Sequence, residues 1–335
     1  MVWLLIAVAH AGYGVPIDGV PNPAERELFV WTNAVRMDPA AFAQAYACAF
    51  DEFEESEKTP KTPVLWHDGL GEIARLHSVD MRTNGELSHD SSDGTPFGDR
   101  VRKYYPNGAL GENIAFGYPT PEEAVIDGWM CSTGHRANIM SPDWTDLGTG
   151  ISDRYYTQDF GQGDTSPLAQ PLSMGAHSPV VPTAQVDYLV NFHDVAPPAR
   201  VEVLLAGEPL AMELAWGAAD MGTYRATVDA QADCNRYVFR AELADGTVLR
   251  FPETGEFGFG PCPYTDDEAQ WMAGPGGPPG VPGVADTAAP HFGIDGTDDD
   301  DVRFRDAVGC GCAHGAPPLG GAWLLLVALF WRRRR

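Results

Sequence analysis

Three side chains of this sequence have the chemistry of a reactive or metal-binding site. They are His89 in "LSHDSSDG", Glu112 in "GENIAFG" and His135 in "STGHRANI". Neutral imidazole is the commonest transition-metal ligand, and two histidines with one carboxylate form a workable zinc set with a position open to water or substrate. His89 and His135 each lie beside turn-forming residues, which predicts loops that converge on a surface cleft. Taken singly, none of the three is specific, because a histidine beside a glycine is more often a hydrogen-bonded framework residue.

A second pattern competes for His135. The stretch "GWMCSTGHRANIM" sets Cys131 four residues ahead of it. A thiolate activated by an imidazole would be a nucleophile, whereas an oxidised Cys131 would serve only the framework. The choice depends on the compartment in which the chain folds.

The segments around these residues predict mixed helix and strand over residues 22–162. "PAERELFVWTNAVRM" carries an apolar helical stripe that Pro39 interrupts, and "LGEIARLHSVDM" carries a second stripe that Gly85 closes. His77 lies on that second stripe, so we interpret it as a core histidine. Thr120 with Glu123 three residues later has a capping-box pattern, and "DLGTGISDRYYTQDFG" fits strands.

The composition changes after residue 162. Residues 163–183 are rich in Pro, Ser and Gln and are predicted to be a linker. Residues 184–263 alternate apolar and polar side chains between Gly and Asp turns, which predicts a small antiparallel β-sandwich of Ig-like type. Residues 264–309 are rich in Pro, Gly and Asp and are predicted to be a disordered spacer, because they cannot bury enough apolar surface to offset the entropy of ordering.

Both ends of the chain indicate export. Residues 1–11, "MVWLLIAVAHA", form an apolar run that closes on a small-x-small pattern and predict a signal peptide, although basic residues before the run are missing; a buried strand is the alternative. Within residues 310–335, thirteen uncharged residues precede four arginines. That run is shorter than the ~20 residues that a helix needs to span a membrane, but the arginines would hold its end on the cytoplasmic side. We expect a membrane-anchored protein delivered to the outer cell surface.

The charge of the chain limits its partners. Its 22 basic and 47 acidic residues give a net charge of -25. Such a chain repels phosphate backbones, so a nucleic acid partner is not expected.

Export also bears on the six cysteines, because thiols oxidise outside the cell. Cys48 is the only other cysteine in the region of Cys131, and we predict that they form a disulfide. Cys234 and Cys262 flank the last predicted hairpin and are expected to form a second one.

Six motifs in order resemble the CAP superfamily (cysteine-rich secretory proteins, antigen 5 and pathogenesis-related 1 proteins; SCP domain) in its bacterial form. They are "TNAVRMDPAAF", "LWHDGLGEIARLHSVDM", "LSHDSSDGTPFGDR", "GENIAFG", "GWMCSTGHRANIM" and "LGTGISDRYYTQDFG". The resemblance implies a three-layer α-β-α sandwich whose cleft is formed by two histidines and acidic residues and at times holds zinc or another divalent cation. His89, Glu112 and His135 fall on the cleft positions. Eukaryotic members often carry a second cleft glutamate just after the residue matching Trp129, where this chain has "MCST".

The tail "VGCGCAHGAPPLGGAWLLLVALFWRRRR" resembles the myxobacterial sorting tail MYXO-CTERM. That resemblance implies an envelope processing protease as a partner, with Cys310 or Cys312 as the processed residue. A plain single-pass anchor is the alternative.

Three functions are compatible with these observations. The first is a cell-surface binding module whose His/Glu cleft takes a lipid, peptide or cell-wall glycan, with or without a metal. The second is a zinc-dependent extracellular hydrolase in which Glu112 is the general base. Two roles, that of the general base and that of the third zinc ligand, would then both require the one carboxylate of Glu112. The third is a structural envelope protein whose two histidines only form hydrogen bonds.

Overall fold

The computed structural model of the chain describes residues 21–163, 166–182, 184–231, 233–259 and 313–315. Its helical elements are α1 (Pro23–Met37), η1 (Pro39–Phe42), η2 (Phe50–Glu52), α2 (Asp68–Asn84), α3 (Phe97–Val101), α4 (Pro121–Glu123), the π-helix η3 (Ala124–Trp129), α5 (Thr133–Ile139) and η4 (Pro167–Ala169). None of the described helices is both long and apolar enough to span a membrane.

The first sheet contains the candidate cleft residue Glu112. Its strands are β1 (Leu65–Trp66), β2 (Leu110–Phe116), β3 (Asp146–Ser152), β4 (Tyr155–Gly161) and β14 (Ala313–Gly315). They follow the spatial order β1-β3-β4-β2-β14, and only β1 and β3 are parallel. The β3–β4 hairpin agrees with the predicted strands.

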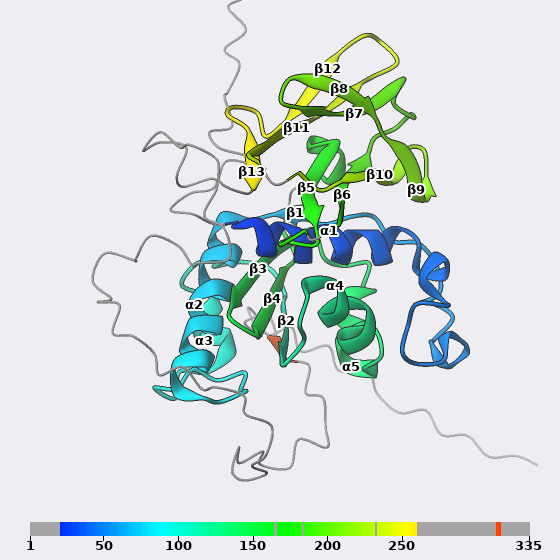
Figure 1. Cartoon of the computed structure of the whole chain (residues 1–335). Coiled ribbons are helices and arrows are strands. Elements are labelled where there is room, and N and C mark those ends of the chain that lie inside the picture. The colour runs from blue at the N-terminus through cyan, green and yellow to red at the C-terminus, as the bar shows by residue number, and fades with distance from the viewer. Residues whose placement is uncertain (1–20, 164–165, 183, 232, 260–312, 316–335) are drawn as a thin grey trace, which may run out of the picture.

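Helix α2 covers one face of this sheet (Figure 1). Gly148 and Gly150 of β3 allow the close approach, since a Cβ at Gly148 would lie 2.0 Å from the backbone carbon of Leu70. The hydroxyl groups of Ser78 and Thr157 join helix and sheet at 2.8 Å. The helix ends as predicted at Gly85, whose φ of 65° is the left-handed conformation that glycine favours.

Helices α1, η3 and α5 cover the opposite face. Gln158 donates to the Thr32 hydroxyl of α1 at 2.6 Å, and the indole of Trp129 donates to the carbonyl of Ile114 at 3.1 Å. The Thr120 side chain accepts a hydrogen bond from the Glu123 amide, as its capping pattern predicts. The region is therefore mixed α/β, with helices on both sides of a sheet.

The predicted disulfide between Cys48 and Cys131 is present, with 5.4 Å between the Cα atoms. Cys131 is therefore held in the framework and is not a free nucleophile beside His135. Cys234 is disulfide-bonded as well. Its expected partner Cys262 lies outside the described residues, as do residues 1–11, residues 264–309, Cys310 and Cys312.

Changing Cys48 and Cys131 together to serine is expected to lower the free energy of unfolding by about 4 kcal/mol. The reason is that the bond spans 83 residues and restricts the unfolded chain. Urea unfolding followed by circular dichroism measures the difference. A loss below about 1 kcal/mol, or a free thiol at Cys131 in non-reduced peptide maps, would contradict this account.

Two further antiparallel sheets follow. Their strands are β5 (Leu172–Ser178), β6 (Gln185–His193), β7 (Arg200–Leu205), β8 (Glu208–Ala211), β9 (Glu213–Ala218), β10 (Met221–Asp229), β11 (Asn235–Glu242), β12 (Val248–Phe251) and β13 (Phe257–Phe259). One sheet has the order β5-β6-β10-β9 and the other β12-β11-β7-β8, with β13 on β11. The sheets contact each other through aromatic groups; for example, the ring centroids of Tyr188 and Tyr237 are 4.9 Å apart.

The start of this β-region differs from the prediction. Residues 172–178, which we expected in a linker over 163–183, form the fully buried strand β5. The polar composition of these residues predicted a loop, but β5 is covered on both faces. Ser178 donates to Glu27 of α1, and Gly175 lies against the ring of Phe239 in the other sheet. Small and polar residues fit these close contacts.

Helix α1 consequently lies between the first sheet and the β-region (Figure 1). Every one of its residues except Ala24 is buried. Asn191 of β6 donates to the carbonyl of Val30, and the ring centroids of Trp31 and Trp216 are 5.2 Å apart. One continuous hydrophobic core therefore joins the region 22–162 to the β-sheets.

Candidate functional site

His89 and Glu112 are in direct contact. His89 lies in the segment after α2, and Glu112 lies in β2 with its side chain on the face toward α2. The His89 Nδ1 lies 2.7 Å from Glu112 Oε1. The Glu112 carboxyl is fully buried, while 23% of the His89 side chain is exposed. The buried carboxylate thus orients a ring that reaches the surface.

Arg100 of α3 is the cation that holds this pair. Its Nη2 donates to Glu112 Oε2, and its Nη1 donates to the backbone carbonyl of His89 at 2.6 Å. His77 lies behind them, with its Nε2 3.9 Å from Glu112 Oε2. One guanidinium therefore fixes both the carboxylate and the segment that carries His89.

The charge state of Glu112 follows from these contacts. Burial alone would raise its pKa, but the hydrogen bond with His89 and the charge of Arg100 outweigh burial and lower the pKa below its ordinary value. Glu112 is therefore ionised at neutral pH. Its oxygens accept hydrogen bonds, and the Nδ1 of His89 donates.

A second buried carboxyl, Asp159, stands opposite Glu112 in the β2–β4 pairing. Burial raises its pKa well above the ordinary value, and the charge of Glu112 raises it further. Glu112 is therefore ionised, while Asp159 retains its proton more strongly than an ordinary aspartate, as expected when two acids share a low-dielectric site.

His135 approaches from the other side of β2. It lies in the first turn of α5 (Thr133–Ile139), whereas the sequence predicted a loop. Its backbone carbonyl accepts from the Asn113 amide at 3.1 Å, which ties it to the residue beside Glu112. Burial lowers the pKa of its imidazole to about 4, and the neighbouring His89 lowers it as well. His135 is therefore neutral at physiological pH and lies within electrostatic range of His89.

The predicted metal set fits this geometry only in part. The part of the chain that the structure describes contains no group of three or more His, Cys, Asp or Glu side chains arranged to hold a metal. Both oxygens of Glu112 are bonded, one with His89 and one with Arg100. Glu112 is thus suited to orienting a histidine, as second-sphere carboxylates do in metal proteins, and not to direct coordination.

Sequence reasoning missed Arg100 and Asp159. Asp159 had a signal, because a carboxylate between Gln158 and Phe160 in a predicted strand needs a partner when buried. Arg100, in "FGDR", had none, because its bond to Glu112 depends on how α3 packs. His77 is buried as expected, with its Nε2 2.8 Å from the carbonyl of Ser88.

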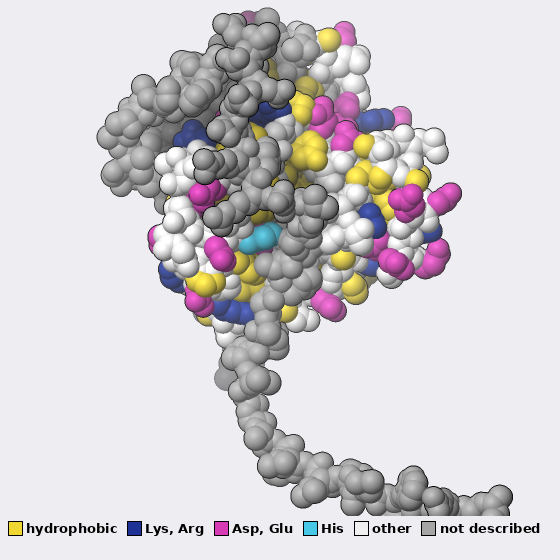
Figure 2. All heavy atoms as spheres, turned by 90° about the horizontal axis from the view of Figure 1, so that it is seen from below, with side chains coloured by type: hydrophobic (Ala, Val, Ile, Leu, Met, Phe, Trp, Pro, Cys, Tyr) yellow, Lys and Arg dark blue, Asp and Glu magenta, His cyan; other side chains and the backbone are white. Residues whose placement is uncertain are grey.

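Figure 2 shows the face of the molecule that lies away from the β-sheets. A histidine side chain reaches the surface there, among interspersed acidic and basic side chains (Figure 2). Where described side chains are visible on this face, acidic groups lie among basic, apolar and other side chains, in spite of the net charge of -25.

Short stretches of several bacterial proteins are similar to this chain. From Bacillus subtilis (strain 168), the uncharacterized membrane protein YlbC is 38% identical over 96 residues, 28% of this chain and 28% of that protein. The uncharacterized protein YkwD is 38% identical over 110 residues, 32% of this chain and 42% of that protein. The chain thus spans less than half the length of either relative.

Solved structures are similar over comparable lengths. An extracellular protein containing a SCP domain from Bacillus anthracis str. Ames is 35% identical, with a TM-score of 0.29, over 31% of this chain and 35% of that one. A cysteine-rich secretory protein from Staphylococcus aureus subsp. aureus Mu50 is 16% identical, with a TM-score of 0.31, over 44% and 40% of the two chains.

A family model agrees with the motifs that carry His89, Glu112 and His135. The model of the cysteine-rich secretory protein family, CAP, matches residues 32–162, which include the first sheet up to β4 and the helices α2 to α5. Residues 32–162 of this chain are therefore a CAP domain.

Proposed function

We propose that this chain is an exported cell-surface protein whose CAP cleft, formed by His89, Glu112 and His135, binds an extracellular ligand. The observation that carries the proposal is the chain of contacts from Arg100 through buried Glu112 to His89. It fixes the orientation of an imidazole that reaches the surface, at the energetic cost of burying two charges.

The neutral imidazole of His135 favours ligands recognised by hydrogen bonds. A lipid headgroup, a peptide or a cell-wall glycan provides the matching donors and acceptors. If a divalent cation such as zinc takes part, the two imidazoles are the residues suited to hold it, with Glu112 behind His89. A bound zinc would supply Lewis acidity to the cleft.

The hydrolase alternative is less well supported. It requires Glu112 to accept a proton from water, but the carboxylate is fully buried and its two oxygens are bonded with His89 and Arg100. A low pKa also makes Glu112 a weak base. Binding therefore remains the first proposal and hydrolysis the second.

Native mass spectrometry of the full-length chain tests the proposal. Lipid vesicles, a peptide mixture and soluble peptidoglycan fragments are offered separately, each with zinc chloride or with a chelator. We expect one of the three ligand classes to be retained by the protein as a complex. The affinity of the protein for that ligand should fall at least about tenfold in the His89→Ala/His135→Ala double variant, because two polar contacts are lost. His193→Ala, in β6, is the matched control.

Equal retention by wild type and double variant, or no retention of any class, would refute the binding proposal. Retention that is the same with zinc and with chelator would refute the metal-mediated form. Turnover of a retained ligand that disappears in Glu112→Gln would move hydrolysis to first place.

A further inference from the structure

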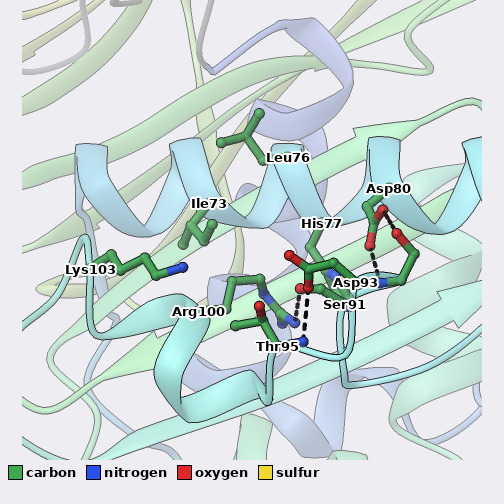
Figure 3. A pocket seen from close by; sticks show the side chains of 10 residues that line it. Ile73, Leu76, His77, Asp80, Ser91, Asp93, Thr95, Arg100 and Lys103 are labelled. Carbon is green, nitrogen blue, oxygen red and sulfur yellow. Dashed lines mark hydrogen bonds between the residues drawn. The ribbon is translucent and has the colours of Figure 1, made fainter.

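A cavity of about 250 Å³ lies between α2 and the segment from Ser91 to Lys103. One wall is apolar and is formed by Ile73 and Leu76, while His77, Arg100 and Lys103 provide polar atoms (Figure 3). The cavity lies on the α2 side of the CAP domain and adjoins the candidate site, because Arg100, which lines it, also donates to Glu112 and to the carbonyl of His89. It is large enough for a small organic molecule.

Two buried nitrogen atoms among the residues around this cavity lack hydrogen-bond partners. They are Nδ1 of His77, a residue that is 1% exposed, and Nε of Arg100, a residue that is 5% exposed. Buried polar atoms are normally paired, because an unpaired one has lost its water without gaining a replacement. Both atoms are therefore suited to a bound group.

The roles of the two nitrogens are opposite. The Nε2 of His77 donates to the carbonyl of Ser88, and burial lowers the pKa of the ring so that it is neutral. Its Nδ1 is consequently an acceptor. Arg100 Nε carries a hydrogen and can only donate. A matching ligand must present a donor to His77 and an acceptor to Arg100.

Lys103 adds a positive charge at the same place. Its side chain extends into the space beside Ile73 in Figure 3. Asp80 and Asp93 stand at the rim, where Asp80 accepts from the amide of Ser92 at 2.8 Å and Asp93 from the amide of Thr95 at 2.8 Å. These two carboxylates would repel a dianion such as phosphate, while a single negative charge can be matched by Lys103.

We propose that this cavity binds a small monocarboxylic acid that carries a hydroxyl or amino group next to the carboxylate and a branched apolar side chain. The carboxylate accepts from Arg100 Nε and pairs with Lys103. The hydroxyl or amino group donates to His77 Nδ1. The apolar side chain contacts Ile73 and Leu76.

Calorimetric titration of the full-length chain at pH 7 tests this site with three probes. They are 2-hydroxy-4-methylpentanoate, leucine and 4-methylpentanoate, of which the last lacks the donor. We expect the hydroxy acid or leucine to bind, and 4-methylpentanoate to bind about tenfold more weakly or worse, because it leaves His77 Nδ1 unpaired. The stronger of the first two probes identifies the donor as hydroxyl or amine.

Variants locate the binding within the protein. Lys103→Met, at an exposed position that tolerates change, is expected to weaken binding at least about tenfold through loss of a charge-assisted contact. Lys58→Met is the matched control, and His135→Ala in the cleft should leave the affinity unchanged. Two results would overturn the proposal: the same affinity in wild type and Lys103→Met, or no binding of either donor-bearing acid at about 10 mM, a concentration that reveals even a millimolar Kd.

Discussion

Changing Arg100 to methionine is expected to lower the free energy of unfolding by about 3 to 5 kcal/mol, because it leaves the Glu112 carboxylate buried without its cation. The loss should exceed that of any single contact in the cleft, since Arg100 also holds the backbone carbonyl of His89. Guanidinium unfolding at pH 7 measures it. Arg82→Met, in the exposed last turn of α2, is the control and should change stability by no more than about 0.5 kcal/mol.

At acidic pH, the free energies of unfolding of wild type and Arg100→Met should differ by less than they do at pH 7. The folded pKa of Glu112 is lowered from its ordinary value of 4.5, so the stabilisation it provides is present above that pH and is lost as the pH falls through the folded pKa. The variant lacks the part of this stabilisation that the charge of Arg100 provides, and it keeps the part that comes from the hydrogen bond with His89. A loss below about 1 kcal/mol at pH 7 would show that Arg100 is not needed to compensate Glu112.

Changing Glu27 to glutamine is expected to remove most of a steep decline in stability between pH 5 and pH 8. Glu27 lies on α1, fully buried against β5, where Ser178 donates to its Oε1 at 2.7 Å. Burial raises its pKa from 4.5 to about 8, against the opposing hydrogen bond from Ser178. Over these pH values the unfolded chain releases the proton that the folded chain keeps, so stability falls as the pH rises.

The size of this effect follows from the proton linkage. Each pH unit contributes about 1.4 kcal/mol, so wild type should lose about 4 kcal/mol from this one group between pH 5 and pH 8. Glutamine keeps an acceptor for Ser178 and does not titrate. Urea unfolding at pH 5, 6, 7 and 8 compares wild type, Glu27→Gln and the exposed control Glu86→Gln. Parallel pH profiles for all three proteins would refute the assignment.

Local signals in the sequence predicted much of the CAP domain. Gly85 ends α2, Thr120 caps α4, and the β3–β4 hairpin lies where "DLGTGISDRYYTQDFG" indicates. The Cys48–Cys131 disulfide followed from cysteine content and export. Each of these features depends on residues that are close in sequence or on a choice between few partners.

Features that depend on packing could not be predicted in the same way. Strand β5 was assigned to a linker because its small and polar residues match a loop composition, although contacts from α1 and from Phe239 bury it. The link from Arg100 to Glu112 and the pairing of Glu112 with Asp159 require the register of β2 on β4 and the placement of α3. The stripe on α1 predicted one buried face, whereas the helix is buried on all sides.

The burial of α1 on all sides also restricts how the molecule can move. A hinge between the CAP domain and the β-sheets would have to pull Trp31 from Trp216 and Val30 from Asn191, exposing a face that has no other cover among the described residues. Shear or rotation at this boundary is therefore costly. We therefore expect the CAP domain and the β-sheets to keep a fixed orientation, so a surface bound by the sheets would also set the direction that the exposed part of the His89 ring faces.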